Sequence, residues 1–180
     1  MSKKLFVVTG PSGAGIGDVL SAVFVRRSDL ATVTPLTARK KKEGEQDGVE
    51  FFFYELEEWN ALKAAGDLLE TTEFAGNDYG TSRKLVEEQL AAGRNVLLNL
   101  SVERAAQIKR SMPEAVCVYI EPSPEVLCER CRRVARSEFE VSVRMETAAR
   151  QRALADFCDY FLNSDDIGSA ASALEALFDP

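Results

Sequence analysis

The sequence predicts an α/β fold in which a parallel sheet carries helices on both of its faces. Three segments, residues 5–9, 95–100 and 116–120, are short and largely apolar, which is typical of strands buried on both sides. Amphipathic helical segments separate these strands along the chain, and this alternation favours parallel pairing. A glycine-rich turn at residues 10–15 joins the first strand to the first helix, as in loops that bind phosphate.

The other elements follow from helix-stop and turn signals. Gly66, Gly93 and Pro113 mark the ends of three helices, because glycine and proline continue a helix poorly. The expected helices are residues 17–27, 55–66, 82–93, 102–111, 124–136, 141–157 and 167–178, and residues 160–162 are an expected short strand.

Residues 31–81 interrupt the alternation. Residues 49–54 are rich in strand-forming side chains, and Gly76-Asn77 predicts a turn between two short strands. We therefore expect an inserted, β-rich subdomain in this part of the chain.

Composition restricts the function. The chain has 180 residues, which suits one domain, with 46% hydrophobic and 28% charged residues. No apolar run approaches the roughly 20 residues that span a bilayer, and the first strand is too short for a signal-peptide core. The net charge of −7 argues against a nucleic-acid partner. Two basic blocks, residues 39–42 and 130–136, are either solvated faces or the attraction for a small anionic ligand.

The cysteines leave two interpretations open. Cys128 and Cys131 form a Cys-x-x-Cys pair, which is either a redox or metal site or simply two reduced thiols on one helical face. The chain contains no histidine, and Cys117 and Cys158 are isolated, so reduced thiols are favoured and no metal site is expected. We expect a reducing, cytoplasmic location.

The glycine-rich turn has the form of a P-loop without its charge. The usual motif ends in Gly-Lys-Ser/Thr or Gly-Lys-Gly-Thr, whereas here Ile16 stands at the lysine position and Asp18 at the hydroxyl position. Backbone amides can still cradle a phosphate. The residues expected to form this cradle are Gly10, Ser12, Gly13, Ala14, Gly15 and Gly17.

The chain resembles the guanylate kinase family across residues 5–178. The resemblance rests on Thr37-Ala38-Arg39, Gly44-Glu45-x-Asp47-Gly48, Leu69-Glu70, Gly76-Asn77-Asp78-Tyr79-Gly80-Thr81 and Asn163-Ser164-Asp165-Asp166. It implies a parallel five-stranded P-loop core, a GMP-binding subdomain and a helical lid, and the transfer of a phosphoryl group from ATP to GMP with Mg²⁺. The implied bounds are 1–33 and 82–180 for the core, about 34–81 for the GMP-binding subdomain and about 128–150 for the lid.

The resemblance assigns a GMP site that is altered but recognisable. It implies that Glu70, Thr81 and Ser101 face the guanine base, with Ser101 standing where an aspartate is usual. Guanine offers N–H donors, so its pocket requires acceptors. The implied phosphate-binding residues are Arg39 and Tyr79, together with Lys42 and Phe51 in place of an arginine and a tyrosine.

The ATP side departs further from the family. The resemblance implies that Arg132 and Arg144 clamp the transferring phosphate, whereas Asn99 replaces an aspartate that helps to hold the metal shell. Asp18 is either repelled by the phosphates or a ligand of Mg²⁺. We count Asp18 with the two arginines as the catalytic candidates.

Arg133 and Arg136 either replace missing lid arginines or form a solvated face. We therefore expect impaired phosphoryl transfer with retained binding of GMP or another small phosphorylated ligand. The alternatives are a slow enzyme and an inactive phospholigand-binding interaction module, for which a protein partner is possible.

Overall fold

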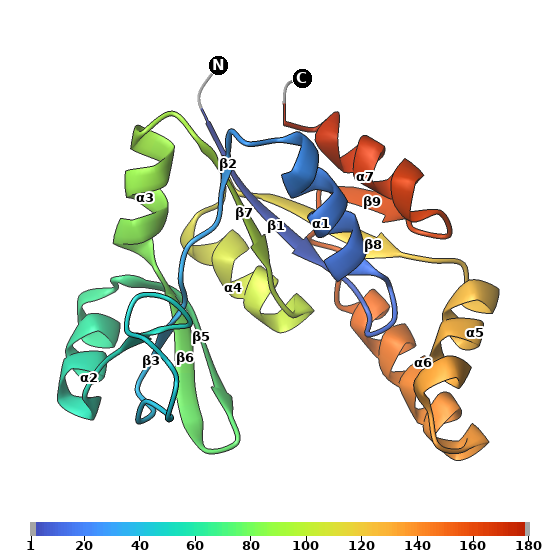
Figure 1. The fold of residues 1–180 in the computed structure, drawn as a ribbon, viewed down its shortest axis with the longest axis horizontal. Helices are drawn as coiled ribbons and strands as arrows, with labels where there is room; N and C mark the ends of the chain where they lie inside the picture. The colour runs from blue at the N-terminus through green and yellow to red at the C-terminus, as the bar shows by residue number, and fades with distance from the viewer. Residues whose placement is uncertain (1–2, 179–180) are drawn as a thin grey trace.

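The core of the molecule is a parallel sheet with the strand order β2-β7-β1-β8-β9 (Figure 1). The computed structural model describes residues 3–178. Every pairing in this sheet is parallel. The strands are β1 (Leu5–Thr9), β2 (Leu30–Ala31), β7 (Asn95–Asn99), β8 (Val116–Glu121) and β9 (Tyr160–Asn163). The predicted fold class is confirmed. The strand β2 was not predicted, because a segment of two residues is too short to show a hydrophobic periodicity.

Successive side chains of the central strand pack on opposite faces of the sheet. Leu5 and Val7 belong to one hydrophobic cluster, whereas Phe6 and Val8 belong to another. A strand with both faces buried is apolar at every position, which explains the uninterrupted apolar run in the sequence.

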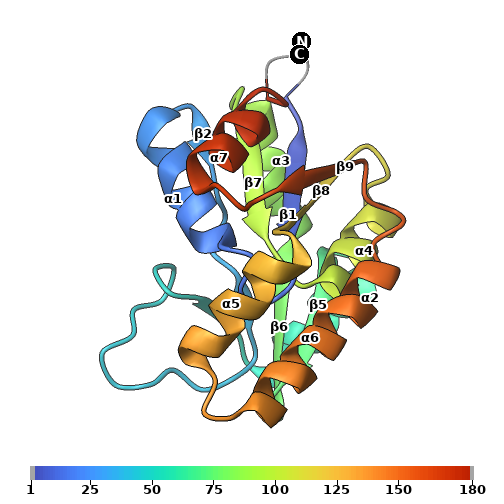
Figure 2. The same ribbon diagram turned by 90° about the vertical axis from the view of Figure 1, so that its right-hand side faces the viewer.

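Helices cover both faces of the sheet (Figures 1 and 2). One hydrophobic cluster includes buried side chains of α1 and α7, and the other includes those of α3 and α4. The helices of the described residues are α1 (Ile16–Arg26), α2 (Leu56–Ala65), α3 (Arg83–Ala91), α4 (Val102–Ser111), α5 (Pro124–Val134), α6 (Glu138–Ala153) and α7 (Ile167–Glu175). Among the described residues, no helix combines the length and apolar character that crossing a membrane requires.

The predicted insert forms a sheet of its own, with the order β4-β3-β6-β5. Its strands are β3 (Leu36–Thr37), β4 (Phe52–Phe53), β5 (Leu68–Phe74) and β6 (Asn77–Ser82). In Figure 1 the insert lies at the lower left, and the α5–α6 pair lies at the lower right. The exact bounds of the subdomain and the lid stay predictions.

Two element predictions need correction. The strand expected at residues 49–54 is only two residues long, because the preceding chain turns at Gly48, which has φ +80° and donates its N–H to the Phe51 carbonyl. The helix expected at residues 141–157 begins at Glu138, because the Ser137 hydroxyl caps it by accepting from the Glu140 N–H. It ends at Ala153, where the chain turns instead of continuing the helix.

Candidate nucleotide-binding site

The glycine-rich turn presents the amino end of α1. Gly13 and Gly15 have φ of +95° and +79°, a backbone conformation that glycine adopts without strain. Gly15 is the N-cap of α1, and Val19 donates to its carbonyl. The first N–H groups of a helix have no partner within the helix, so this end of α1 favours an anion.

A cavity of about 450 Å³ opens beside this turn. Four of the residues predicted from the P-loop pattern line it, together with three arginines of the α5–α6 pair. The lining residues are Ser12, Gly13, Gly15, Asp18, Arg130, Cys131, Arg133, Val134, Arg144 and Ile167. The fold thus brings a helix amino end and a group of cations to one cavity.

Ile16 is turned toward the core. Its side chain is half-buried and packs against the hydrophobic cluster of α1 and α7. Its Cδ1 lies 3.1 Å from the position that a Cβ on Gly10 would occupy. Asp18, in contrast, is exposed in the first turn of α1 and faces the cavity. The first turn of α1 therefore offers the cavity a carboxylate and no cation.

Arg130 links the P-loop to a distant part of the chain. Its Nη1 donates to the Ala14 carbonyl at 3.1 Å, and its Nη2 donates to the Ser164 carbonyl at 2.8 Å. The buried Ser164 hydroxyl also donates to the Ala14 carbonyl, at 2.7 Å. Arg130 lies in the basic block at residues 130–136, and the sequence pattern assigns it no role of its own. Nothing local shows that it reaches the loop, because 116 positions separate it from Ala14.

The remaining arginines near the cavity are paired with glutamates. Arg144 donates through Nη2 to Glu140 at 2.8 Å and lines the cavity. Arg132, the other predicted clamp, is more than half exposed and pairs with Glu138 at 3.3 Å. Arg132 is not among the described residues that line this cavity. Its predicted contact with a transferring phosphate stays a prediction.

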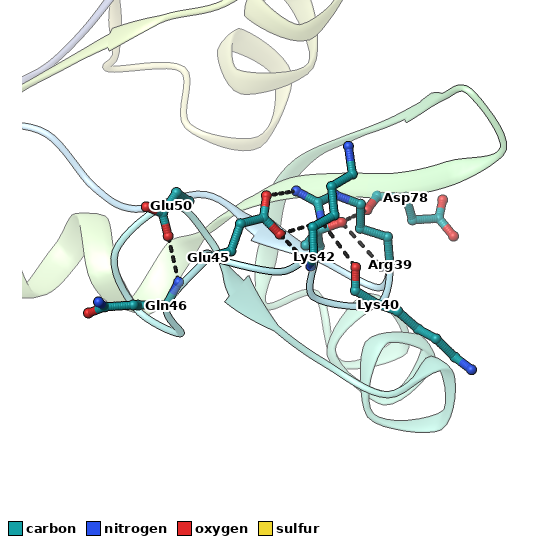
Figure 3. Close-up of polar contacts among 8 residues, drawn as sticks. Arg39, Lys40, Lys42, Glu45, Gln46, Glu50 and Asp78 are labelled. Carbon is teal, nitrogen blue, oxygen red and sulfur yellow. Dashed lines mark hydrogen bonds and ion pairs between the residues drawn. The ribbon is translucent and has the colours of Figure 1, made fainter.

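The predicted monophosphate site is centred on Arg39 (Figure 3). Its guanidinium donates to both carboxylate oxygens of Glu45, at 2.7 and 2.5 Å. It also lies over the rings of Phe51 and Phe53, with 4.9 and 5.3 Å from its Cζ to the ring centroids. Hydrogen bonds to Glu45, and secondarily to Tyr79, raise the pKa of Arg39. The side chain is only 9% exposed, so Arg39 is held in place before any ligand binds.

Glu45 fixes this cation in turn. The hydrogen bond from Arg39, and then that from the backbone N–H of Lys42, lower the pKa of Glu45 to about 2. The side chain of Lys42, a predicted phosphate ligand, is exposed. The contact of Lys42 with Glu45 is made by its backbone N–H. Glu45 lies in the Gly44-Glu45 motif, yet no role was predicted for it.

The predicted base-contacting residues are engaged with one another and with Arg104. Glu70 is buried, and the buried Thr81 donates to it at 2.7 Å. Arg104 donates to the same carboxylate at 2.6 and 2.7 Å. Ser101 is the N-cap of α4, where its hydroxyl accepts from the Arg104 N–H at 3.5 Å. Asn99 is exposed at the end of β7.

The Cys-x-x-Cys pair lies on α5. Cys131 is buried and lines the cavity, and burial raises the pKa of its thiol. A raised pKa disfavours the thiolate that metal binding and redox chemistry require. Within residues 3–178, no cluster of three or more acidic, histidine or cysteine side chains is placed to hold a metal ion.

The parallel sheet, the glycine-rich loop at the end of β1 and the inserted subdomain together define a protein with the P-loop NTPase fold. A family model described as guanylate kinase matches residues 2–180. Guanylate kinases of Carboxydothermus hydrogenoformans and Parasynechococcus marenigrum are 38% and 39% identical to this chain over 175 residues. These alignments cover 96% of this chain and 86% and 96% of the two relatives. The chain therefore belongs to the guanylate kinase family, whose members bind GMP and ATP and use Mg²⁺.

Solved structures agree on the fold. A guanylate kinase from Anaplasma phagocytophilum has a TM-score of 0.67 and 24% identity, and the match covers 98% of this chain and 84% of that one. A shikimate kinase from Bacteroides thetaiotaomicron has a TM-score of 0.53 and 16% identity, over 98% and 99% of the two chains. At these identities the likeness concerns the fold alone.

Proposed function

We propose that this chain is a guanylate kinase homologue that binds GMP or another small phosphorylated ligand, and that transfers a phosphoryl group from ATP to GMP only weakly. The observation that carries the proposal is the orientation of Ile16. Its side chain packs into the core, so the first turn of α1 itself supplies no cation to the loop that would cradle the phosphates.

Charge at this position matters because phosphoryl transfer depends almost wholly on positioning and electrostatic stabilisation. Deleting one such preorganised group typically costs about 3–4 kcal/mol of transition-state stabilisation. The three arginines that line the cavity, Arg130, Arg133 and Arg144, are already bonded to backbone carbonyls or glutamates. These bonds must be broken or shared before any of the three arginines can take over the missing role.

The residues present also bear on Mg²⁺. This ion is usually bound by one or two carboxylates together with substrate phosphates, and Asp18 is the carboxylate that lines the cavity. Asp18 would therefore hold Mg²⁺, which supplies neutralisation of phosphate charge when bound. Without the ion, the Asp18 carboxylate repels a triphosphate in the same cavity.

The monophosphate side supports binding without transfer. Arg39 is clamped by Glu45 and two aromatic rings, and a preorganised guanidinium binds a phosphate with little loss of side-chain freedom. A second candidate function, binding of a phosphorylated protein segment, is favoured by a cavity of about 370 Å³ in the insert, which Arg39, Lys40 and Lys41 line. For the compartment we propose the cytoplasm, consistent with four free cysteines in the described residues.

Two measurements test the proposal. A coupled assay with ATP, Mg²⁺ and GMP should give turnover well below the usual enzyme range of about 1–1000 per second. Calorimetry should detect binding of GMP or another phosphomonoester and much weaker binding of ATP. Turnover within the usual range overturns the impairment. Binding of a phosphorylated peptide in preference to every small phosphomonoester supports the second candidate.

A further inference from the structure

Arg104 and Glu70 form a closed ion pair between α4 and β5. Arg104 Nε donates to Glu70 Oε2 at 2.6 Å, and Nη2 donates to Oε1 at 2.7 Å. The Thr81 hydroxyl donates to the same Oε1 at 2.7 Å. The Glu70 side chain is 0% exposed, whereas that of Arg104 is 21% exposed. The carboxylate is therefore sealed, and Arg104 is the member of the pair whose side chain reaches solvent.

This arrangement conflicts with recognition of guanine. The Watson–Crick edge of guanine presents the N1–H and the 2-amino group, both of which are donors and need free acceptors. Glu70 Oε1 already accepts two hydrogen bonds, which uses both of its lone pairs. Oε2 accepts one hydrogen bond and has no surface at which a base could approach. Guanine can reach this carboxylate only by displacing Arg104.

Displacement is unfavourable because Arg104 belongs to a rigid contact. On the same face of α4, Gln107 exchanges two hydrogen bonds with the backbone of Thr71 at 2.9 and 3.1 Å, and Ser111 donates to the Leu69 carbonyl. Arg104 thus extends a row of hydrogen bonds from α4 to β5. Breaking a buried ion pair leaves an uncompensated charge, which is strongly unfavourable.

The second predicted acceptor is also engaged. The Ser101 hydroxyl accepts the Arg104 backbone N–H as the N-cap of α4, at 3.5 Å. Arg104 thus contacts both predicted acceptors: its side chain saturates Glu70, and its backbone N–H occupies one of the two lone pairs of the Ser101 hydroxyl. The partly exposed side chain of Arg104 carries a guanidinium, which has hydrogen-bond donors and no acceptor.

We propose that Arg104 closes the guanine-reading site, so that this chain selects its ligand by the phosphomonoester group and not by the guanine base. The inference rests on the proposed binding of a phosphorylated ligand at Arg39 and specifies the ligand class. Nucleoside 5′-monophosphates and sugar phosphates are then bound with similar affinity. A site whose polar groups are built to bond a substrate discriminates by orders of magnitude, and here that discrimination is absent.

Calorimetric titration of the full chain with GMP, AMP and ribose 5-phosphate tests this inference. For the unaltered chain, the three dissociation constants should agree within about threefold. Arg104→Ala frees Glu70, and it should strengthen GMP binding by about tenfold or more while leaving ribose 5-phosphate binding unchanged. Preference of the unaltered chain for GMP by more than about tenfold overturns the inference.

Three further variants control the result. Arg110→Ala removes the same charge from an exposed position of α4 and should leave all three affinities unchanged. The double variant Glu70→Gln with Arg104→Ala should lose the gained GMP affinity. If Arg104→Ala does not fold, Arg104→Gln is the alternative variant. Glutamine cannot form the bidentate contact with Glu70 but can still donate one hydrogen bond to it. This variant should also bind GMP more tightly than the unaltered chain does.

Failure of the proposed function gives a different pattern. Absence of binding for all three ligands to the unaltered chain overturns the proposed function. The inference is then decided by Arg104→Ala alone: the appearance of GMP binding supports it, and continued absence of GMP binding overturns it.

Discussion

Gly10 lies directly against the carbonyl oxygen of Ile120. A Cβ on residue 10 would be 2.0 Å from that oxygen, far inside van der Waals contact. The contact joins the start of the P-loop to the neighbouring strand β8, and both partners are backbone. The loop can therefore leave β1 along this path only if residue 10 has no side chain.

Gly10→Ala is expected to destabilise the protein by about 1–3 kcal/mol or more, because two backbone segments must move apart. Gly17→Ala is the matched control, since a Cβ at that position in α1 would meet nothing within 4 Å apart from its chain neighbours and the helix's own backbone. This control should raise the free energy of unfolding by about 0.5–1 kcal/mol, because alanine favours helix. Urea denaturation of both variants measures the difference. Equal free energies of unfolding for the two variants would contradict the backbone contact.

Ser164→Ala should loosen the P-loop. It removes a buried hydroxyl that donates to the Ala14 carbonyl at 2.7 Å, and we expect a loss of about 1 kcal/mol. Ser142→Ala removes an exposed hydroxyl on α6 and should change the free energy of unfolding by less than about 0.5 kcal/mol. Hydrogen exchange of the P-loop amides should accelerate only in the Ser164 variant; unchanged exchange would show that Arg130 alone holds Ala14 in place.

Restoring a cation at the amino end of α1 should restore some transfer. The double variant Ile16→Lys with Asp18→Thr replaces an apolar side chain and a carboxylate with the groups a P-loop uses on phosphates and metal. We expect the ATP-dependent turnover of GMP to rise by about 10²-fold. Val25→Lys places a lysine on α1 at an 88% exposed position, away from the first turn, and should leave turnover unchanged. A double variant that folds and binds ATP but gains no turnover would place the defect in the α5–α6 pair.

The Arg39–Glu45 pair predicts a dependence of stability on pH. Arg39 and the Lys42 N–H lower the pKa of Glu45 from 4.5 to about 2 in the folded protein. The folded state therefore binds this proton less readily than the unfolded state does. The resulting stabilisation is present above about pH 4.5 and is lost as the pH falls toward 2.

Glu45→Gln lacks this stabilisation at every pH. Its free energy of unfolding should fall less than that of the unaltered chain between pH 4.5 and 2. Glu43→Gln removes one negative charge from the same exposed loop and controls for net charge. Denaturant unfolding at several pH values provides the measurement. Parallel curves for the unaltered chain and Glu45→Gln would refute the coupling.

Local patterns were sufficient for much of the fold. Strands β1, β7 and β8 followed from their apolar runs, because a strand buried on both faces is apolar at each position, and the end of α4 followed from the nearby Pro113. The strand expected at residues 49–54 was mostly wrong, since the turn at Gly48 confines the strand to Phe52–Phe53. Tertiary packing overrode local propensity at this place.

By itself, the sequence determined the fold class, the glycine-rich loop and the absence of a lysine at residue 16, because these depend on local residue types and spacing. Only the tertiary structure decided how the charged side chains pair. Arg130 reaches Ala14 across 116 positions, and Arg104 reaches Glu70 across 34. The sequence predicted that Glu70 contacts the guanine base. In the structure, the packing of α4 on β5 places Arg104 against this carboxylate. Such pairs depend on which elements pack together, and no local pattern contains that information.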